Sequence, residues 1–376
     1  MGGASMWRRF LWAFAITGAV FLALCLALIL LVDPIGVSPI ALATPKSGYA
    51  FKDRRFLAQQ VIRSGRFDSY LVGSSTLHSV DPEWANAAFG GRFANVSIHG
   101  ATLYELRRVV ELAGRSVPDL RRVVLGLDVK RWCRAEPPRR YHRKAVFPEW
   151  LYDGSRLNDF EALLNMKMLN AAFAQLAVDV KRNAPAVPAN GYRNELDDTK
   201  WAAFKAKEGS CEGGCDKHVA LEEEDEDEPA DAEESVRVYP ALPWLRQAIL
   251  SLPKKTEFIA VLMPLKASAL ARLPAPERNR IEACKQRIAR LAARRHGTVV
   301  DFFVASDWTR NDDNFWDSDH LRVGFARALI FRVKEAVMRR RDADDGVYRV
   351  ITGDAPDKQQ PADAAETNGT PGPLNR

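Results

Sequence analysis

The sequence has little that would let it cross a membrane more than once. Only residues 10–32 form an uncharged, proline-free apolar run of spanning length, and no second run of that kind follows. At about 1.5 Å per helical residue this run reaches roughly 34 Å, enough for a hydrocarbon core of about 30 Å. The sequence therefore predicts one transmembrane anchor and argues against a protein with several membrane spans.

The charges on the two sides of this run differ. Arg8 and Arg9 precede it, whereas Asp33 and Pro34 follow it. The positive-inside bias places residues 1–9 in the cytoplasm. The rest of the chain is then expected on the periplasmic, extracytoplasmic side of a bacterial inner membrane.

The competing interpretation is a cleaved signal peptide, with Ala-Leu-Ala at residues 41–43 as the cleavage site. The apolar part of such a peptide spans only about 7–15 residues. Residues 10–32 are longer than that, and residues 41–43 lie well beyond them. An uncleaved anchor is therefore favoured, and both interpretations export the remainder of the chain.

Cysteine is scarce, with 5 residues in 376. Cys25 lies in the predicted span, Cys284 falls on the apolar face of a predicted helix and is expected to be a small core residue, and Cys133 stands alone. Cys211 and Cys215 could form a small disulfide in an oxidising compartment.

A metal site is not expected. Cys211 and Cys215, together with His218, resemble part of one, but the surrounding segment is rich in Gly and Glu and has no fourth ligand. The sequence therefore predicts neither a bound metal nor a cofactor.

The net charge of +6 conceals an uneven distribution. Ten of the 48 acidic residues lie within residues 222–234, so the rest of the chain is strongly basic. A basic body beside a membrane suits anionic lipid headgroups or acidic envelope polymers, although it also serves simply for solubility. Nucleic acid is not an expected partner, because the domain is exported and no basic-aromatic motif is present.

Apolar strands and amphipathic helices alternate along most of the chain. Strands are predicted at residues 67–72, 93–98, 122–127, 256–263 and 298–303. Helices are predicted at residues 53–64, 82–89, 276–296 and 322–339, and a further helix follows Thr102. This alternation indicates an α/β fold with a doubly wound, mainly parallel five-stranded sheet.

Two helix starts carry specific signals. Asp81 followed by Pro82 supplies a capping residue and then a proline in the first helical turn. Thr102 and Glu105 form a capping box, in which each side chain bonds to the other residue's amide. These signals fix where the helices on either side of the second strand begin.

The alternation is interrupted by an insertion at residues 129–254. Residues 159–181 have helical periodicity, whereas residues 207–236 are expected to be a disordered acidic loop. The predicted organisation is a stalk, an α/β domain that contains this insertion, and a disordered tail. Their bounds are 33–52, 53–340 and 354–376.

Polar residues follow the predicted strands, where a parallel sheet places its binding crevice. A nucleophilic serine needs a base, and the base needs an orienting carboxylate. Ser75, in a turn after Gly73, is the candidate nucleophile. His320 is the candidate base, and Asp317 is its orienter. The amides of Ser75 and Gly100 are the candidate oxyanion donors, since glycine lets the backbone approach a substrate closely.

These motifs resemble those of the SGNH/GDSL hydrolase superfamily. They are Gly73-Ser74-Ser75 after the first strand, the block 95–100 after the second, and Asp317-x-x-His320 before the last helix. The sequence is most similar to the membrane-anchored, exported branch, which includes alginate O-acetylation proteins and the D-alanyl-lipoteichoic acid transfer protein. The resemblance covers residues 55–130 and 256–340. It implies that Ser75, His320 and Asp317 act as nucleophile, base and orienter, with Gly100 as an oxyanion donor.

One position departs from that pattern. The third block of the family is Gly-x-Asn-Asp, whose asparagine donates to the oxyanion. Here the block is Gly126-Leu127-Asp128. An ionised Asp128 would repel an oxyanion, so this side chain is expected to point away or to have another partner.

Other residues near the site have simpler interpretations. Asp319 is a rival to Asp317 but, as the immediate neighbour of His320, is expected to point elsewhere. His78 and His99 could touch a substrate, although structural roles are favoured. Trp316 is expected to pack the loop.

The resemblance implies an exported serine acyl-esterase or O-acyltransferase that acts on acyl, most simply acetyl, esters of a cell-envelope polysaccharide. A membrane-bound acyltransferase is a possible partner. The alternative is a non-catalytic protein that binds the polymer or acts as a scaffold in a modification complex. Asp128 and the large insertion favour that alternative modestly.

Overall fold

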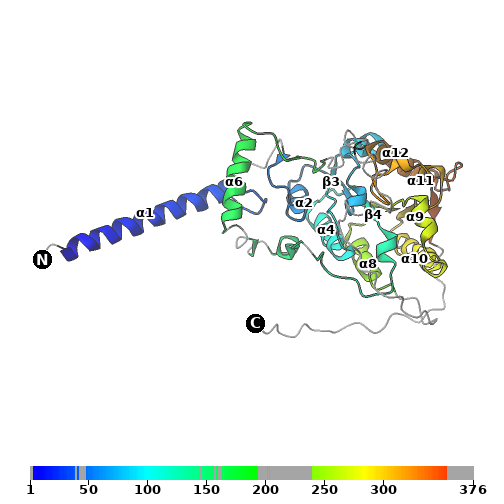
Figure 1. Cartoon of the computed structure of the whole chain (residues 1–376), viewed down its shortest axis with the longest axis horizontal. Coiled ribbons are helices and arrows are strands. Elements are labelled where there is room, and N and C mark those ends of the chain that lie inside the picture. The colour runs from blue at the N-terminus through cyan, green and yellow to red at the C-terminus, as the bar shows by residue number, and fades with distance from the viewer. Residues whose placement is uncertain are drawn as a thin grey trace.

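The computed structural model describes residues 3–38, 40–41, 48–143, 145–155, 158–159, 163, 165–193, 201, 203 and 239–353 (Figure 1). The acidic segment 207–236, Cys211, Cys215, His218 and the tail 354–376 lie outside these residues. The helices are α1 (Gly3–Val32), α2 (Arg54–Arg63), α3 (Pro82–Phe89), α4 (Leu103–Ser116), α5 (Val129–Trp132), α6 (Met166–Asp179), α8 (Leu242–Ser251), α9 (Ala267–Arg272), α10 (Ala275–Ala293), α11 (Asp307–Arg310) and α12 (Val323–Arg339).

The centre of the domain is a mixed sheet with the strand order β3-β2-β4-β6-β7-β8. Neighbouring strands from β3 to β7 are parallel, and β8 pairs with β7 antiparallel. The strands are β2 (Ser69–Val72), β3 (Phe93–Asn95), β4 (Arg122–Leu127), β6 (Glu257–Leu262), β7 (Thr298–Asp301) and β8 (Arg349–Ile351). The five parallel strands follow a 2-1-3-4-5 order, one of the two common orders in doubly wound sheets.

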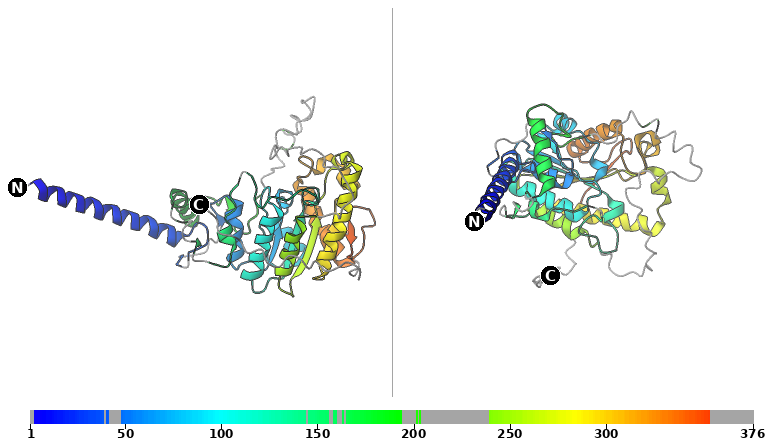
Figure 2. Two further views of the ribbon diagram at one scale, coloured as in Figure 1. Left: turned by 90° about the horizontal axis from the view of Figure 1, so that it is seen from below. Right: turned by 60° about the vertical axis from the view of Figure 1, so that its left-hand side comes forward.

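Helices cover both faces of the sheet (Figure 2). One face packs against α2, α4, α8 and α10, and the other packs against α3 and α12. Successive side chains of a strand point to opposite faces of the sheet, so each strand contributes to both cores. Val123 and Leu125 of β4 face the first core, and Val124 faces the second. Burial on both faces explains why these strands read as continuous apolar runs.

The predicted five-stranded sheet was one strand short. β8 adds a sixth strand at the edge, where Arg349 donates to the fully buried Asp301 of β7 at 2.9 Å. The strand is only three residues long and half-exposed. It therefore lacks the buried apolar run by which the five parallel strands were recognised.

Both predicted helix starts are confirmed. Asp81 accepts from the amide of Glu83 at the start of α3, with Pro82 in the first turn. Thr102 and Glu105 form the predicted capping box at the start of α4. The helix predicted over residues 159–181 is shorter, because α6 begins only after Asn165 caps the amide of Met168.

The segment predicted as a stalk packs on the domain at residues 33–38 and 48–52, whereas Ile40 between them is exposed. Ile35 and Val37 are buried in the core that contains α2. The short strand β1 (Gly48–Tyr49) pairs antiparallel with β5 (Val187–Pro188) of the insertion. Pro34, one of the three prolines that suggested an extended stalk, is buried, and Pro39 and Pro45 lie outside the described residues.

The cysteine predictions need correction. Cys133, expected to stand alone, and Cys284, expected to be a free core residue, form a disulfide across a sequence separation of 151. The bond joins the segment after α5 to α10, and both residues are buried. The sequence gives no sign that these two cysteines pair, because only the tertiary fold brings them together.

Candidate active site

The candidate site lies at the carboxyl edge of the sheet, between β2 and β4. Ser75 begins the 3₁₀ helix η1 (Ser75–Leu77) after β2, and Asp128 directly follows β4. Strand order reverses between these two strands, because β3 lies on one side of β2 and β4 on the other. Such a switch point leaves a crevice at the carboxyl ends of the strands.

The turn that holds Ser75 is tight. A Cβ added at Gly73 would lie 2.9 Å from the Cβ of Leu77, so only glycine fits here without displacing η1. Ser74 caps η1 by accepting from the amide of Thr76. Ser75 is the one residue from 71 to 80 that is half-buried rather than buried.

The loop from Phe315 to Leu321 is equally constrained. These two residues form an antiparallel bridge, which brings the ends of the loop together. Asp317 Oδ1 accepts from the amides of Asp319 at 3.0 Å and His320 at 2.8 Å. The predicted packing role of Trp316 agrees with its burial, 5 % exposed.

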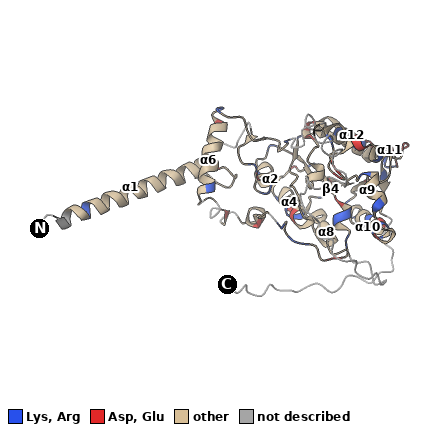
Figure 3. Cartoon of the chain, in the orientation of Figure 1, with Lys and Arg blue, Asp and Glu red and all other residues tan. Residues whose placement is uncertain are grey.

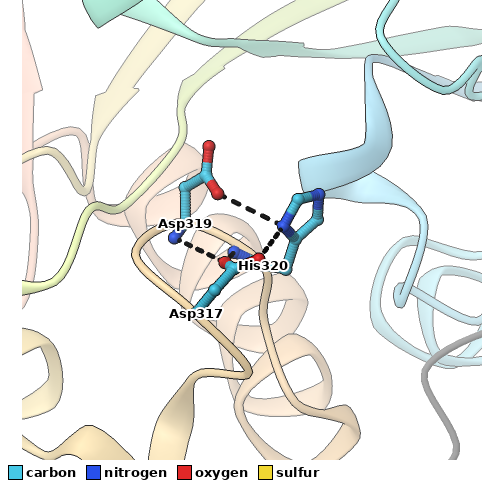
Figure 4. Close-up of side chains that lie close together, drawn as sticks. All are labelled: Asp317, Asp319 and His320. Atoms are coloured by element: carbon cyan, nitrogen blue, oxygen red, sulfur yellow. Dashed lines mark hydrogen bonds and ion pairs between the residues drawn. The ribbon is translucent and has the colours of Figure 1, made fainter. Parts of the chain in front are cut away.

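These two turns bring the three predicted residues into one chain of contacts. The Nε2 atom of His320 lies 2.8 Å from Ser75 Oγ, although the residues are 245 positions apart in sequence. The Nδ1 atom of His320 lies 2.6 Å from Asp317 Oδ2 (Figure 4). Each imidazole nitrogen thus has the partner that a serine–histidine–aspartate triad requires.

The carboxylates determine how this histidine titrates. Burial alone would lower the pKa of His320, but the hydrogen bond to Asp317 and the charges of Asp319, Asp317 and Asp128 outweigh it and raise the pKa to about 9. Burial would likewise raise the pKa of Asp317, but hydrogen bonds from His320 and from two backbone amides lower it well below its usual range. Asp317 is therefore ionised at neutral pH.

Asp319 also contacts the base. Its Oδ1 atom lies 3.2 Å from His320 Nδ1, so the expectation that it points elsewhere is wrong. Burial and the charges of Asp317 and Asp128 raise the pKa of Asp319, while His320 opposes the shift. The side chain is still 40 % exposed, so contact with solvent limits this effect.

Asp128 has hydrogen-bond partners of its own, which is one of the two outcomes that the sequence left open. Its carboxylate accepts from Ser74 Oγ at 2.5 Å and from Thr76 Oγ1 at 2.8 Å. The hydroxyls on either side of Ser75 in sequence are thus fixed to one acidic group. Asp128, at the position that the resemblance assigns to the third block, is therefore an acceptor that holds the serine turn.

The loop after β3 is joined to the serine turn. The amide of Ile98 donates to Gly73 O at 2.9 Å, and Asn95 Nδ2 donates to Leu77 O and Val80 O. Gly100 follows with φ 57°, a left-handed conformation that favours glycine. The predicted second oxyanion donor thus lies on a loop fixed to the turn of Ser75.

Two histidines stack beside these loops. The rings of His78 and His99 lie 4.2 Å apart between centroids. His78 is buried, and within the described part of the chain neither of its ring nitrogens has a hydrogen-bond partner. Burial and the nearby charges of Arg54, His99, His320 and Arg193 lower its pKa, so His78 is neutral in the fold.

Asp317, Asp319 and His320 also form the one group of three metal-type ligands found among the described residues, with ligand atoms within 4.8 Å of one another (Figure 4). His320 Nδ1 already contacts Asp317 Oδ2 at 2.6 Å. A cation there would have to replace the proton between these two atoms. The geometry therefore fits a histidine–carboxylate pair better than a metal centre.

No protein-family model matches the sequence, and no curated protein matches it at a significant level. The family resemblance therefore rests on its motifs alone. The sequence assigned no role to Thr76, whose hydroxyl donates to Asp128. The Ser-x-Thr pattern around Ser75 was the available signal for Thr76.

Proposed function

We propose that this chain is an SGNH-type serine acyl-esterase or O-acyltransferase. The observation that carries the proposal is the continuous contact from Ser75 Oγ through the imidazole of His320 to Asp317 Oδ2. A serine hydroxyl is a weak nucleophile on its own, and an adjacent oriented base activates it.

In the proposed reaction, Ser75 Oγ attacks the carbonyl carbon of an ester and transfers its proton to His320 Nε2. His320 then gives this proton to the departing alcohol oxygen, which leaves an acyl-serine ester. In the second half, water or an acceptor hydroxyl loses its proton to His320 and attacks that ester. The proton then returns to Ser75 Oγ. Asp317 accepts from Nδ1 throughout and stabilises the imidazolium.

The amides of Ser75 and Gly100 are the proposed oxyanion donors. The carboxylate of Asp128 is already bound by two hydroxyls, which keeps its oxygens occupied beside the serine turn. The oxyanion site proposed for this chain is therefore built from backbone donors.

The proposed substrate is an acyl ester, most simply an acetyl ester, on a cell-envelope polysaccharide. Three features support this class: the apolar helix α1, which is long enough to span a membrane, the motif resemblance, and the basic body of the chain. The Cys133–Cys284 disulfide also suits an exported domain, because such bonds persist in oxidising compartments. Transfer to a polymer hydroxyl is the proposed outcome, with a membrane acyltransferase as the proposed acyl supplier.

The test is covalent labelling of the purified full chain with a fluorophosphonate probe, together with turnover of a small acetyl ester. Wild-type protein should label, and Ser75→Ala should not. Adding a polysaccharide with free hydroxyls should then distinguish transfer from hydrolysis by acetylation of the polymer.

A non-catalytic binding or scaffold role is the second candidate. It is favoured by Asp128, which stands where the related enzymes place a donor asparagine. Wild-type protein that neither labels nor turns over an acetyl ester, but binds polymer, would replace the enzyme proposal with this one.

A further inference from the structure

Helix α6 has apolar side chains on two opposite faces. One face packs into the domain through Met168, Ala172 and Val178, each at most 3 % exposed. At about 100° per residue, a second stripe runs along the other side of the helix. Its exposed fractions are 69 % for Met166, 56 % for Phe173, 39 % for Leu176 and 56 % for Val180. A surface helix normally presents polar residues there, so this stripe needs an apolar partner.

The position of α6 indicates that partner. Helix α6 contacts α1 and lies across the end of α1 that joins the domain (Figure 1). Ile29 and Val32 of α1 are buried, whereas residues 6–24 are exposed along their whole length. The domain therefore packs against only the last two turns of α1.

The length of α1 indicates how deep in the membrane α6 would lie. Measured from Arg9, residues 10–24 account for roughly 22 Å of helix, less than a hydrocarbon core of about 30 Å. The core would therefore extend past Leu24 to the part of α1 that the domain covers. An element packed on that part lies at the boundary between acyl chains and headgroups.

Charge at the two ends of α6 fits the same location. Lys167 lies in its first turn, with its ammonium over the rings of Phe51 and Phe56, and Lys181 and Arg182 follow the C-cap residue Val180 (Figure 3). Basic residues flanking an apolar stripe are typical of helices that lie in the membrane interface and attract anionic lipids.

We infer that α6 is an interfacial helix whose stripe, Met166, Phe173, Leu176 and Val180, enters the outer-leaflet surface of the bilayer that α1 spans. The inference rests on the anchor, which is part of the proposed function. It goes beyond that function, because two contacts with the membrane fix the orientation of the domain, whereas a single helix would leave it free to swivel.

The test uses the full chain in vesicles of phosphatidylcholine and phosphatidylglycerol. Cys25→Ala, Cys211→Ser and Cys215→Ser remove the other thiols and retain the disulfide. A single cysteine, introduced as Leu22→Cys, Phe173→Cys or Met338→Cys, then carries an environment-sensitive fluorophore. Met338 is the matched control, because it is 64 % exposed and apolar but lies on α12.

Spin-labelled phospholipid should quench the fluorophore at positions 22 and 173, with a blue shift in emission, and should leave position 338 unchanged. Omitting phosphatidylglycerol should reduce the quenching at 173 more than at 22. Quenching at 22 with none at 173 would overturn the inference and make the stripe a protein-docking surface. Absence of quenching at 22 would overturn the anchor and the inference together, while leaving the esterase assay to judge the proposed chemistry.

Discussion

Ser74, Ser75 and Thr76 are three consecutive hydroxyl residues with two different kinds of partner. The outer two donate to Asp128, and the middle one contacts His320. At the scale of single residues, a shift of one position therefore separates the proposed nucleophile from the groups that hold its turn.

Ser75→Ala is expected to abolish fluorophosphonate labelling and to lower acetyl-ester turnover by at least about 10³-fold with the fold intact. His320→Ala should lose nearly as much, and Asp317→Asn somewhat less, because the base then remains without its orienter. The losses should not add in combination, since the three residues act as one unit. Turnover by each variant, with circular dichroism as the check on folding, measures this.

Ser74→Ala is the register control for that series. It removes a hydrogen bond to Asp128, so a loss of roughly 1–3 kcal/mol in unfolding free energy is expected, but labelling should persist. If Ser75→Ala still labels and Ser74→Ala does not, the nucleophile is one residue earlier.

The pH dependence follows from the raised pKa of His320, about 9. The base acts only when unprotonated, so kcat/KM should rise with pH through a midpoint well above the usual histidine value of about 6.5. Asp319→Asn removes one negative neighbour and should move this midpoint to lower pH. Asp307→Asn, which removes an exposed charge on α11, should leave it in place; equal shifts in both variants would contradict the local origin of the effect.

Asp128→Ala should misplace the serine turn without removing any reacting group. We expect kcat to fall by about 10- to 100-fold with little change in KM, because small displacements of a nucleophile are costly. Asp128→Asn keeps an acceptor oxygen and should recover part of the loss. An unchanged kcat in Asp128→Ala would remove the positioning role.

At the scale of elements, local signals were sufficient wherever the partner lies nearby in sequence. The cap at Asp81, the box of Thr102 and Glu105, and the five parallel strands were all predicted, because each depends on a few neighbouring residues or one buried run. The close approach of Ser75 to His320 agrees with placement at the ends of parallel strands.

The rest depends on distant partners. β8 is defined by β7 and by Arg349 with Asp301, and the disulfide by two residues far apart, so no local pattern reveals either. Asp128 was recognised as unusual, but its bonds to Ser74 and Thr76 required the register of β2 beside β4.

The disulfide is expected to stabilise the domain strongly. For a loop of this length, the chain-entropy description gives about 5 kcal/mol, and measured effects are commonly about 2–4 kcal/mol. Cys133→Ser should therefore lower the melting temperature by on the order of 10 °C. Cys25→Ala removes a free cysteine of α1 and is the control, which should leave the melting temperature unchanged. Equal melting of the two variants would show that the bond is not formed in the protein as isolated.

At the scale of the whole molecule, the sheet extends from β3, on the side of the anchor, to β8 at the far edge (Figure 2). If α1 is retained as an anchor, the mature protein should keep residues 1–32. A reporter active only outside the cytoplasm, fused after Asp33, should also be active. A mature N-terminus near Thr44, found by mass spectrometry, would instead show a cleaved signal peptide.

The disulfide also changes how the two halves of the site are connected. Ser75 and His320 are 245 residues apart along the chain, and the Cys133–Cys284 bond bypasses 151 of them. A protease cut anywhere in the bypassed stretch would leave nucleophile and base in one covalent molecule until the bond is reduced. The bypassed stretch contains the acidic segment and most of the insertion. The bond therefore keeps nucleophile and base covalently linked even where the insertion is cut.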